Sequence, residues 1–125
     1  MKLTTLWQDN RGASALEFAL TAPVFFLFIF GIVEFGLLFW TQLGLQHGTE
    51  MAARCATVNS TLCPSGSAIT NYAAQQAFGL TLPAQTFTYS TSACGNVVSA
   101  SYAFQFAQFL NLSPVTLTAR ACFPS

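Results

Sequence analysis

The chain has 125 residues with four Lys or Arg, four Asp or Glu and a net charge of zero, and only 6% of its residues are charged. So few charges give no indication of a nucleic-acid surface or of electrostatic steering toward an acidic partner. The first 40 or so residues contain a long apolar segment, which leaves roughly 85 residues for one small domain.

The part between Arg11 and Trp40 is the most apolar of the chain. Residues 18–33 carry no charge, and the apolar character resumes after Glu34. A helix from Ala13 to Trp40 would be about 40 Å long, which exceeds a hydrocarbon core of roughly 30 Å. A secretory signal has only about 7–15 apolar residues and a small-residue cleavage site after them, and no such site follows here. We therefore predict a transmembrane helix over residues 13–40 that stays with the mature chain.

Two separate features indicate that the part after this helix faces away from the cytoplasm. Lys2 and Arg11 precede the helix, and positive charge beside a first membrane span favours the cytoplasmic side. An even number of cysteines in a small domain favours two disulfides and an oxidising compartment. All of the cysteines follow the helix: Cys55, Cys63, Cys94 and Cys122.

The start of the apolar helix resembles a known processing signal. Gly12 is followed by the small residue Ala13, and Glu17 lies five positions after the glycine. This arrangement resembles the class III signal of type IV pilin-like proteins. The strings RGASALEFAL and GIVEFG are similar to the TadE family of minor pseudopilins of the tight-adherence (Tad) pilus, and HGTEMAARCA and LTARACFP also resemble TadE-type domains.

The resemblance implies a processing step and a set of partners. An aspartyl prepilin peptidase would cut between Gly12 and Ala13 on the cytoplasmic face and remove residues 1–12 as a leader peptide. The mature chain would then associate with other pilin-like subunits through its N-terminal helix, in contact with the lipid bilayer and with the inner-membrane pilus assembly platform.

A role for Glu17 in assembly also follows from its position. Cleavage would expose an ammonium group on Ala13, and the Glu17 carboxylate could pair with such a group on a neighbouring subunit. Between packed apolar helices this attraction is far less screened than in water, and an unpaired carboxylate is costly there. Alternatively, Glu17 lies at the membrane interface near the positive end of the helix, which stabilises an anion by about 0.3–1 kcal/mol.

Two further residues interrupt the apolar helix. Pro23 cannot donate a backbone hydrogen bond, so we expect the helix to bend or loosen there. Glu34 lies roughly 10 Å from the middle of the apolar window, where a charge costs less than the value of about 3 kcal/mol at the midplane. Glu34 therefore either lies near the outer interface or contacts a partner helix.

The helical pattern continues over residues 41–56, after Trp40, which we expect to anchor the helix at the membrane interface. Gly44, Gly48 and Ala52 recur every four residues and give this helix one smooth face. Such a face allows close approach of another backbone. It packs either on the protein's own domain or on the helix of a neighbouring subunit.

No reactive constellation is predicted. On a helix, His47 and Cys55 differ by about 80° in direction and 12 Å in rise, so they cannot act as a pair. We predict that His47 is a polar surface residue. The cysteines lack C-x-x-C spacing, which argues against a metal site, and no cofactor is expected.

Residues 57–125 are predicted to form a small extracytoplasmic head. A loop over residues 57–67 leads to a short helix over 68–78, capped by Ser67 and ended by Gly79. Period-two alternation predicts strands over residues 86–93, 96–106 and 115–122, with turns at 93–96 and 111–114.

The preferred disulfides join Cys55 to Cys63 and Cys94 to Cys122. In a simple meander the first and third strands lie about 9.6 Å apart, too far for a disulfide. The second bridge therefore requires Cys94 to reach across from the turn, or a sheet order that places the third strand beside the first.

The predicted fold class is α+β: a long N-terminal helix, partly transmembrane, followed by a small head with a short helix and about three antiparallel strands. The favoured function is a structural or assembly subunit of a Tad-type pilus in a bacterial inner membrane, with the N-terminus cytoplasmic and the head periplasmic. The alternative is an uncleaved bitopic membrane protein whose outer domain binds a ligand or partner. Catalysis is not expected, because the outer domain has a single carboxylate side chain and a single histidine.

Overall fold

The computed structural model describes residues 11–125, except the side chains of Arg11 and Phe109. Most of the leader predicted for residues 1–12, including Lys2, lies outside the described residues. The chain forms two compact units, one ending at Phe35 and one comprising Gly36–Ser125, here called the head unit. Each unit is considered by itself.

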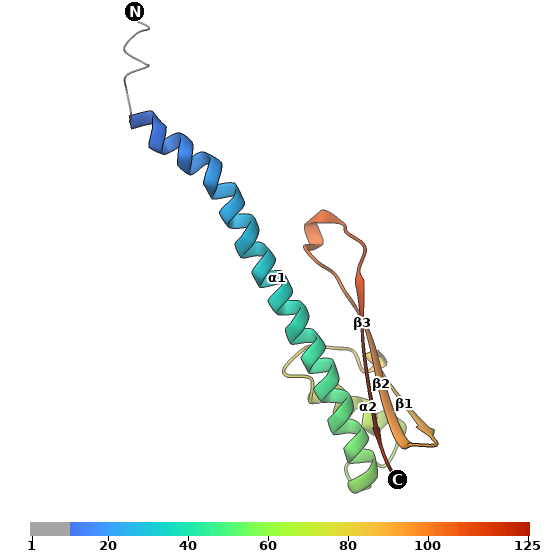
Figure 1. The fold of residues 1–125 in the computed structure, drawn as a ribbon. Helices are drawn as coiled ribbons and strands as arrows, with labels where there is room; N and C mark the ends of the chain where they lie inside the picture. The colour runs from blue at the N-terminus through green and yellow to red at the C-terminus, as the bar shows by residue number, and fades with distance from the viewer. Residues whose placement is uncertain (1–10) are drawn as a thin grey trace, which may run out of the picture. The chain divides into compact units, whose positions relative to one another are not determined.

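One helix, α1, runs from Arg11 to Val58 (Figure 1). Pro23 lies inside it without ending it. Proline lacks an N–H group, so the carbonyl of Ala19 loses its helical donor at that point. The segments predicted separately as a transmembrane helix and its continuation are therefore parts of one element. α1 is long and apolar enough to span a membrane, as judged by its length and composition.

The end of α1 is set by Asn59. The Asn59 N–H still donates to the Cys55 carbonyl at 2.9 Å, and the Asn59 side-chain oxygen accepts from the N–H of Leu62 at 3.0 Å. A side chain that accepts from the backbone in this way stabilises a turn in place of a further helical turn. The loop that follows is closed by a disulfide between Cys55 and Cys63, whose Cα atoms are 6.0 Å apart.

The second helix, α2, comprises Gly66–Gln75, so its predicted cap is wrong. Ser65 is the N-cap, with an extended backbone, and its hydroxyl accepts from the N–H of Ala68 at 3.3 Å. Ser67 lies inside the first turn. The N-cap therefore lies two residues earlier than the sequence predicted.

The C-terminal end of α2 also lies earlier than predicted. The Gln76 N–H bonds to the carbonyls of Tyr72 and Ala73, and Phe78 and Gly79 then adopt positive φ values of 50° and 73°. The predicted helix over residues 68–78 therefore ends three residues short, because the left-handed turn begins at Phe78 rather than at the glycine.

Three antiparallel strands form a sheet in the order β1-β2-β3, as a simple meander. A short 3-10 turn at Ala84–Thr86 leads into β1, which comprises Phe87–Ser92 and is followed by β2 over Gly95–Phe104 and β3 over Val115–Phe123. β2 ends two residues before its predicted end. The α+β fold class predicted from the sequence is confirmed.

The turn between β1 and β2 explains how a bridge forms in this strand order. Ser92 pairs with Gly95, so Ala93 and Cys94 form a two-residue turn. Cys94 is bonded to Cys122 on β3, and their Cα atoms are 6.4 Å apart. Gly95 has a φ of 125°, and a Cβ atom there would collide with the Phe123 carbonyl. A glycine is therefore required where the turn meets the end of β3.

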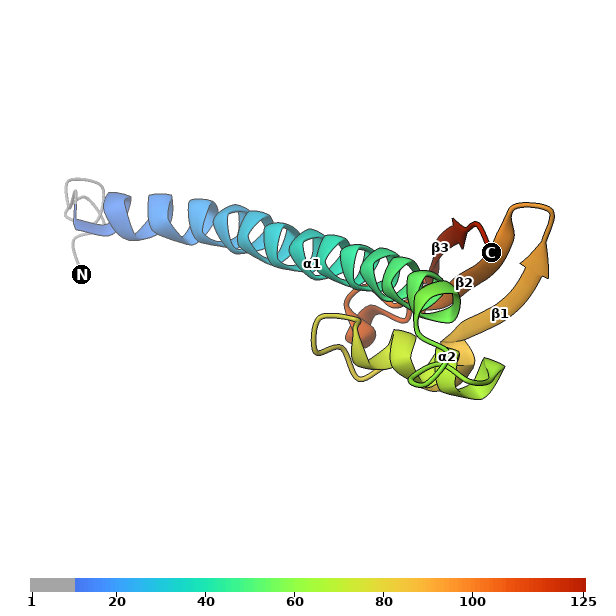
Figure 2. The same ribbon diagram turned by 90° about the horizontal axis from the view of Figure 1, so that it is seen from below.

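The core of the head unit lies between helices and sheet. The part of α1 in this unit and α2 lie beside the sheet, as Figures 1 and 2 show from two sides. Side chains of both helices and of the sheet form one buried cluster. Both helices and all three strands contribute buried members: Leu45, Ala52, Ala73, Phe87, Val98, Ala100 and Leu117. At the two ends of the contact, Gln42 donates to the Thr118 carbonyl at 2.9 Å and Asn96 donates to the Thr57 hydroxyl at 3.0 Å.

The smooth face of α1 packs on the protein's own α2. A Cβ atom at Gly48 would lie 2.7 Å from the Ala73 carbonyl oxygen, and one at Gly44 would lie 3.0 Å from that of Ala77. Ala52 is fully buried. Of the two alternatives for this face, the structure therefore supports packing within the head.

We predict that Gly48→Ala lowers the free energy of unfolding of the head by about 1–3 kcal/mol, because the added methyl group meets backbone that cannot move aside cheaply. Gly36→Ala is the matched control, since nothing lies within 4 Å of a Cβ atom there and alanine has the higher helix propensity. Denaturant unfolding in mild detergent, followed by near-UV circular dichroism, measures both. Equal shifts for the two variants would contradict the close packing.

We also predict that a chymotryptic map without reduction shows no disulfide joining a residue before Tyr72 to one after it. Cleavage after Tyr72 separates the Cys55–Cys63 pair from the Cys94–Cys122 pair. The reduced digest is the control. A cross-linked peptide that spans Tyr72, or free thiols in protein taken from an oxidising compartment, would refute this pairing.

Candidate functional site

The most extensive surface feature is the apolar part of α1 before Gly36. Between residues 12 and 35 every Leu, Ile, Val and Phe side chain is exposed, from 42% at Ile29 to 72% at Leu27. Soluble monomers rarely expose contiguous apolar patches above a few hundred Å². This surface requires lipid or other helices around it.

Gly12 and Ala13 lie in the first turn of α1 and are exposed. The Glu17 side chain is also exposed, while its carbonyl accepts from the Thr21 hydroxyl at 2.9 Å. Residues four apart share one face of a helix, so Ala13 and Glu17 lie one above the other, about 6 Å apart along the axis. The pairing expected between Glu17 and a cleaved N-terminus at Ala13 of a neighbouring subunit depends on this spacing.

Glu34 differs from Glu17 in being partly covered, and it lies next to the boundary at Phe35. Its side chain therefore belongs to the last turn of the N-terminal unit. Its role stays a prediction.

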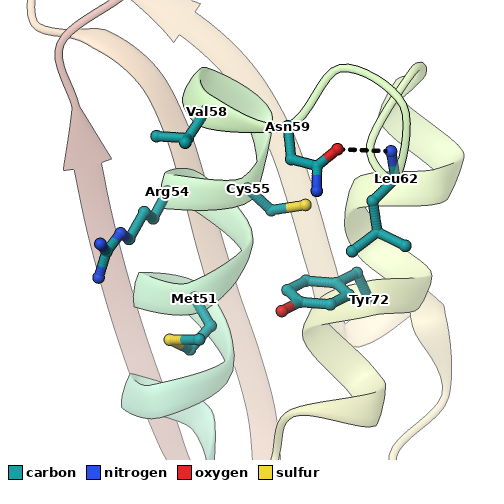
Figure 3. A pocket seen from close by; sticks show the side chains of 7 residues that line it. All are labelled: Met51, Arg54, Cys55, Val58, Asn59, Leu62 and Tyr72. Carbon is teal, nitrogen blue, oxygen red and sulfur yellow. Dashed lines mark hydrogen bonds between the residues drawn. The ribbon is translucent and has the colours of Figure 1, made fainter.

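A pocket of about 170 Å³ lies between the end of α1, the following loop and α2 (Figure 3). Cys55 and Tyr72 face one another across it, and the hydrogen bond from Leu62 to Asn59 closes its loop side. The remaining lining residues are Met51, Arg54 and Val58. Pockets for small molecules usually have volumes of about 300–1,000 Å³. This one is too small to accommodate a typical ligand.

His47 is not the polar surface residue that the sequence predicted. Its Nδ1 lies 2.7 Å from the Gln76 carbonyl oxygen, and its ring stacks on Phe78 with 4.4 Å between centroids. Because a carbonyl can only accept, Nδ1 carries the proton. The Glu50 carboxylate accepts from the Gln46 side chain at 2.7 Å. Both side chains therefore have structural contacts within the head unit.

In residues 11–125 no set of side chains is arranged for thiol or metal chemistry. All four cysteines are in disulfides, so none of them is a free thiol. In that described part, no group of three or more His, Cys, Asp or Glu side chains is placed to hold a metal ion.

One group of exposed side chains was not predicted. Residues 111–114 were expected to form a simple turn, but Leu110 and Leu112 are 58% and 51% exposed in the loop between β2 and β3. The available signal was composition: this loop contains Phe and Leu where surface turns usually carry Gly, Asn, Asp and Ser.

Comparison with known proteins bears on the helical part of the chain. The family model of TadE-like protein matches residues 12–54. The match begins at Gly12, continues through the apolar segment and ends within the buried part of α1, before α2 and the sheet. No curated protein and no solved structure matches the chain. The resemblance to TadE-like proteins is therefore confirmed over residues 12–54, which form most of α1.

Proposed function

We propose that the chain is a structural or assembly subunit of a Tad-type pilus, held in a bacterial inner membrane by α1. The observation that carries this proposal is the TadE-like match over residues 12–54, along a helix whose apolar side chains before Gly36 are exposed. A helix of this kind can be surrounded by lipid before assembly and by the helices of other subunits afterwards.

The head unit faces the periplasm in this proposal, with the N-terminus in the cytoplasm. Support comes from the two disulfides, which persist in an oxidising compartment. The basic residues before the span favour the same orientation. The two arguments are independent because one concerns redox chemistry and the other concerns charge.

Processing would occur between Gly12 and Ala13 and would convert a membrane-anchored precursor into an assembly-competent subunit. Both residues are exposed, so the bond is accessible to a membrane-embedded prepilin peptidase. The new ammonium group would lie one helical turn from Glu17. Pairing between the ammonium of one subunit and the carboxylate of the next would then fix the register of neighbouring helices.

The proposed role is structural rather than catalytic. His47 and Glu50, the residues best suited to acid–base work in the head, contact Gln76 and Gln46 instead of each other. The alternative is an uncleaved bitopic protein whose outer domain binds a ligand or partner, and the pocket at Tyr72, with a volume of about 170 Å³, does not support a small-molecule site for it. The partners we propose are other pilin-like subunits, the prepilin peptidase and the assembly platform.

We predict that the mature protein begins at Ala13, because the signal around Gly12 directs removal of the leader. Intact mass measurement of protein purified from piliated cells tests this directly. Cells that lack prepilin peptidase activity supply the unprocessed control. Material that retains Met1 in cells with an active peptidase would contradict the pilin-like proposal and favour the uncleaved alternative.

We further predict that Glu17→Ala is inserted and processed normally but is incorporated into pili at least about tenfold less than the wild type. A tenfold loss corresponds to about 1.4 kcal/mol, less than the 3–5 kcal/mol typical of breaking a buried ion pair. Immunoblots of sheared pili and of membranes measure assembly and insertion separately.

Glu50→Ala is the matched control, since it also removes one exposed carboxylate but lies in the head. Glu17→Asp keeps the charge and should retain part of the assembly. Normal pili in Glu17→Ala would remove the carboxylate from the assembly mechanism.

A further inference from the structure

The loop between β2 and β3, residues 105–114, lies at one particular end of the head unit. Thr118 on β3 is hydrogen-bonded to Gln42, whereas Asn96, paired with Phe123 at the other end of β3, is bonded to Thr57. β3 therefore runs in the same direction as α1. The β2–β3 loop precedes β3 and lies at the end where α1 enters the unit at Gly36 (Figure 1).

This end, here called the membrane-side end, is joined through Gly36 to the exposed apolar part of α1. Exposed large apolar side chains of the head unit are concentrated there. Only a few, such as Val58, Leu62 and Phe123, lie toward the opposite end. Those at the membrane-side end come from α1, from the turn after α2 and from the β2–β3 loop: Leu37, Phe39, Trp40, Phe78, Leu110 and Leu112.

The apolar side chains of the β2–β3 loop are held outward by a defined backbone. Ala107 and Asn111 adopt left-handed conformations with φ values of 37° and 51°, and the Leu110 N–H donates to the Ala107 carbonyl at 2.7 Å. A left-handed alanine is disfavoured and persists where the surrounding structure imposes it. Leu110 and Leu112 are therefore exposed on a turn whose backbone conformation is defined.

Charge distribution favours a lipid environment for this turn. The chain carries no Asp, Glu, Lys or Arg between Arg54 and Arg120. The polar residues of the loop are uncharged amides and a hydroxyl, at Gln105, Gln108, Asn111 and Ser113. Such groups can remain hydrated among lipid headgroups while neighbouring leucines enter the acyl region.

We propose that the β2–β3 loop, through Leu110 and Leu112, inserts into the outer boundary of the bilayer that α1 spans. This inference rests on the membrane anchoring in the proposed function. The head unit then has a second lipid contact besides α1. Trp40, whose ring centroid lies 5.9 Å from that of Phe78, is a residue type enriched at membrane interfaces.

Lipid is favoured over a second copy of the chain as the occupant. Covalent continuity through Gly36 keeps this end of the head unit near the bilayer in every membrane-anchored molecule, whatever its state of assembly. A second copy would have to be present before these leucines were covered.

Nitroxide labels on the full-length protein in phosphatidylcholine vesicles test the proposal. Leu110→Cys and Leu112→Cys each add one thiol at an exposed loop position outside the strand pairing, while the native cysteines stay in disulfides. Ser90→Cys is the control for the water-exposed head, because Ser90 is exposed and pairs with Val97, about 23 Å along β2 from the loop. Leu27→Cys reports on the anchor itself.

We expect dissolved oxygen to relax the labels at positions 27, 110 and 112 more strongly than a water-soluble nickel chelate does, and the reverse at position 90. The inference is overturned if position 27 responds as lipid-exposed while both loop positions respond as position 90 does. Failure of the anchoring proposal is distinguishable, because position 27 would then also be accessible to nickel. Labels at 110 and 112 that are shielded from both reagents, and become nickel-accessible on dilution with lipid, would assign the loop to a second copy.

Discussion

The head depends on the close approach of α1 and α2 at Gly48. The helix backbone at this residue meets the Ala73 carbonyl at a distance that leaves no room for a side chain. Such contact allows the fully buried Ala52 and Ala73 to share one cluster with the inner face of the sheet. A domain with so few residues has a small core, and the two disulfides supplement it by about 2–4 kcal/mol each. The second half of α1 is therefore a structural member of the head.

Much of this fold could be predicted because its signals are local. Period-two alternation identified the three strands, and an even number of cysteines after the apolar helix indicated two bridges. The cap of α2 was misplaced by two residues, since Ser65 and Ser67 are chemically equivalent and only the extended backbone at Ser65 distinguishes them. The contacts of His47 could not be predicted, because they depend on Gln76 and Phe78, which meet it only in the folded head.

In the candidate site, too, the features set by local spacing could be predicted, whereas those set by tertiary packing could not. The positions of Gly12, Ala13 and Glu17 on one exposed helical segment follow from helical spacing. The face formed by Gly44, Gly48 and Ala52 was ambiguous in sequence, because small residues at intervals of four permit close packing on any partner. The structure resolves that ambiguity in favour of α2. The apolar composition of the loop at Leu110 and Leu112 was readable in the sequence, whereas the left-handed backbone at Ala107 was not, because alanine rarely adopts it.

In the proposed membrane-anchored state, the continuity of α1 from Arg11 to Val58 has a consequence for the crossing from lipid to water. Any helix that stops leaves four carbonyls without internal donors, and a helix that starts leaves four amide groups in the same situation. Had the anchor and the head helix been separate elements, both sets of unsatisfied groups would have fallen near the membrane surface. Because α1 is continuous, its C-terminal end lies at Val58, where the Asn59 N–H donates to the Cys55 carbonyl at 2.9 Å and the exposed end is open to solvent.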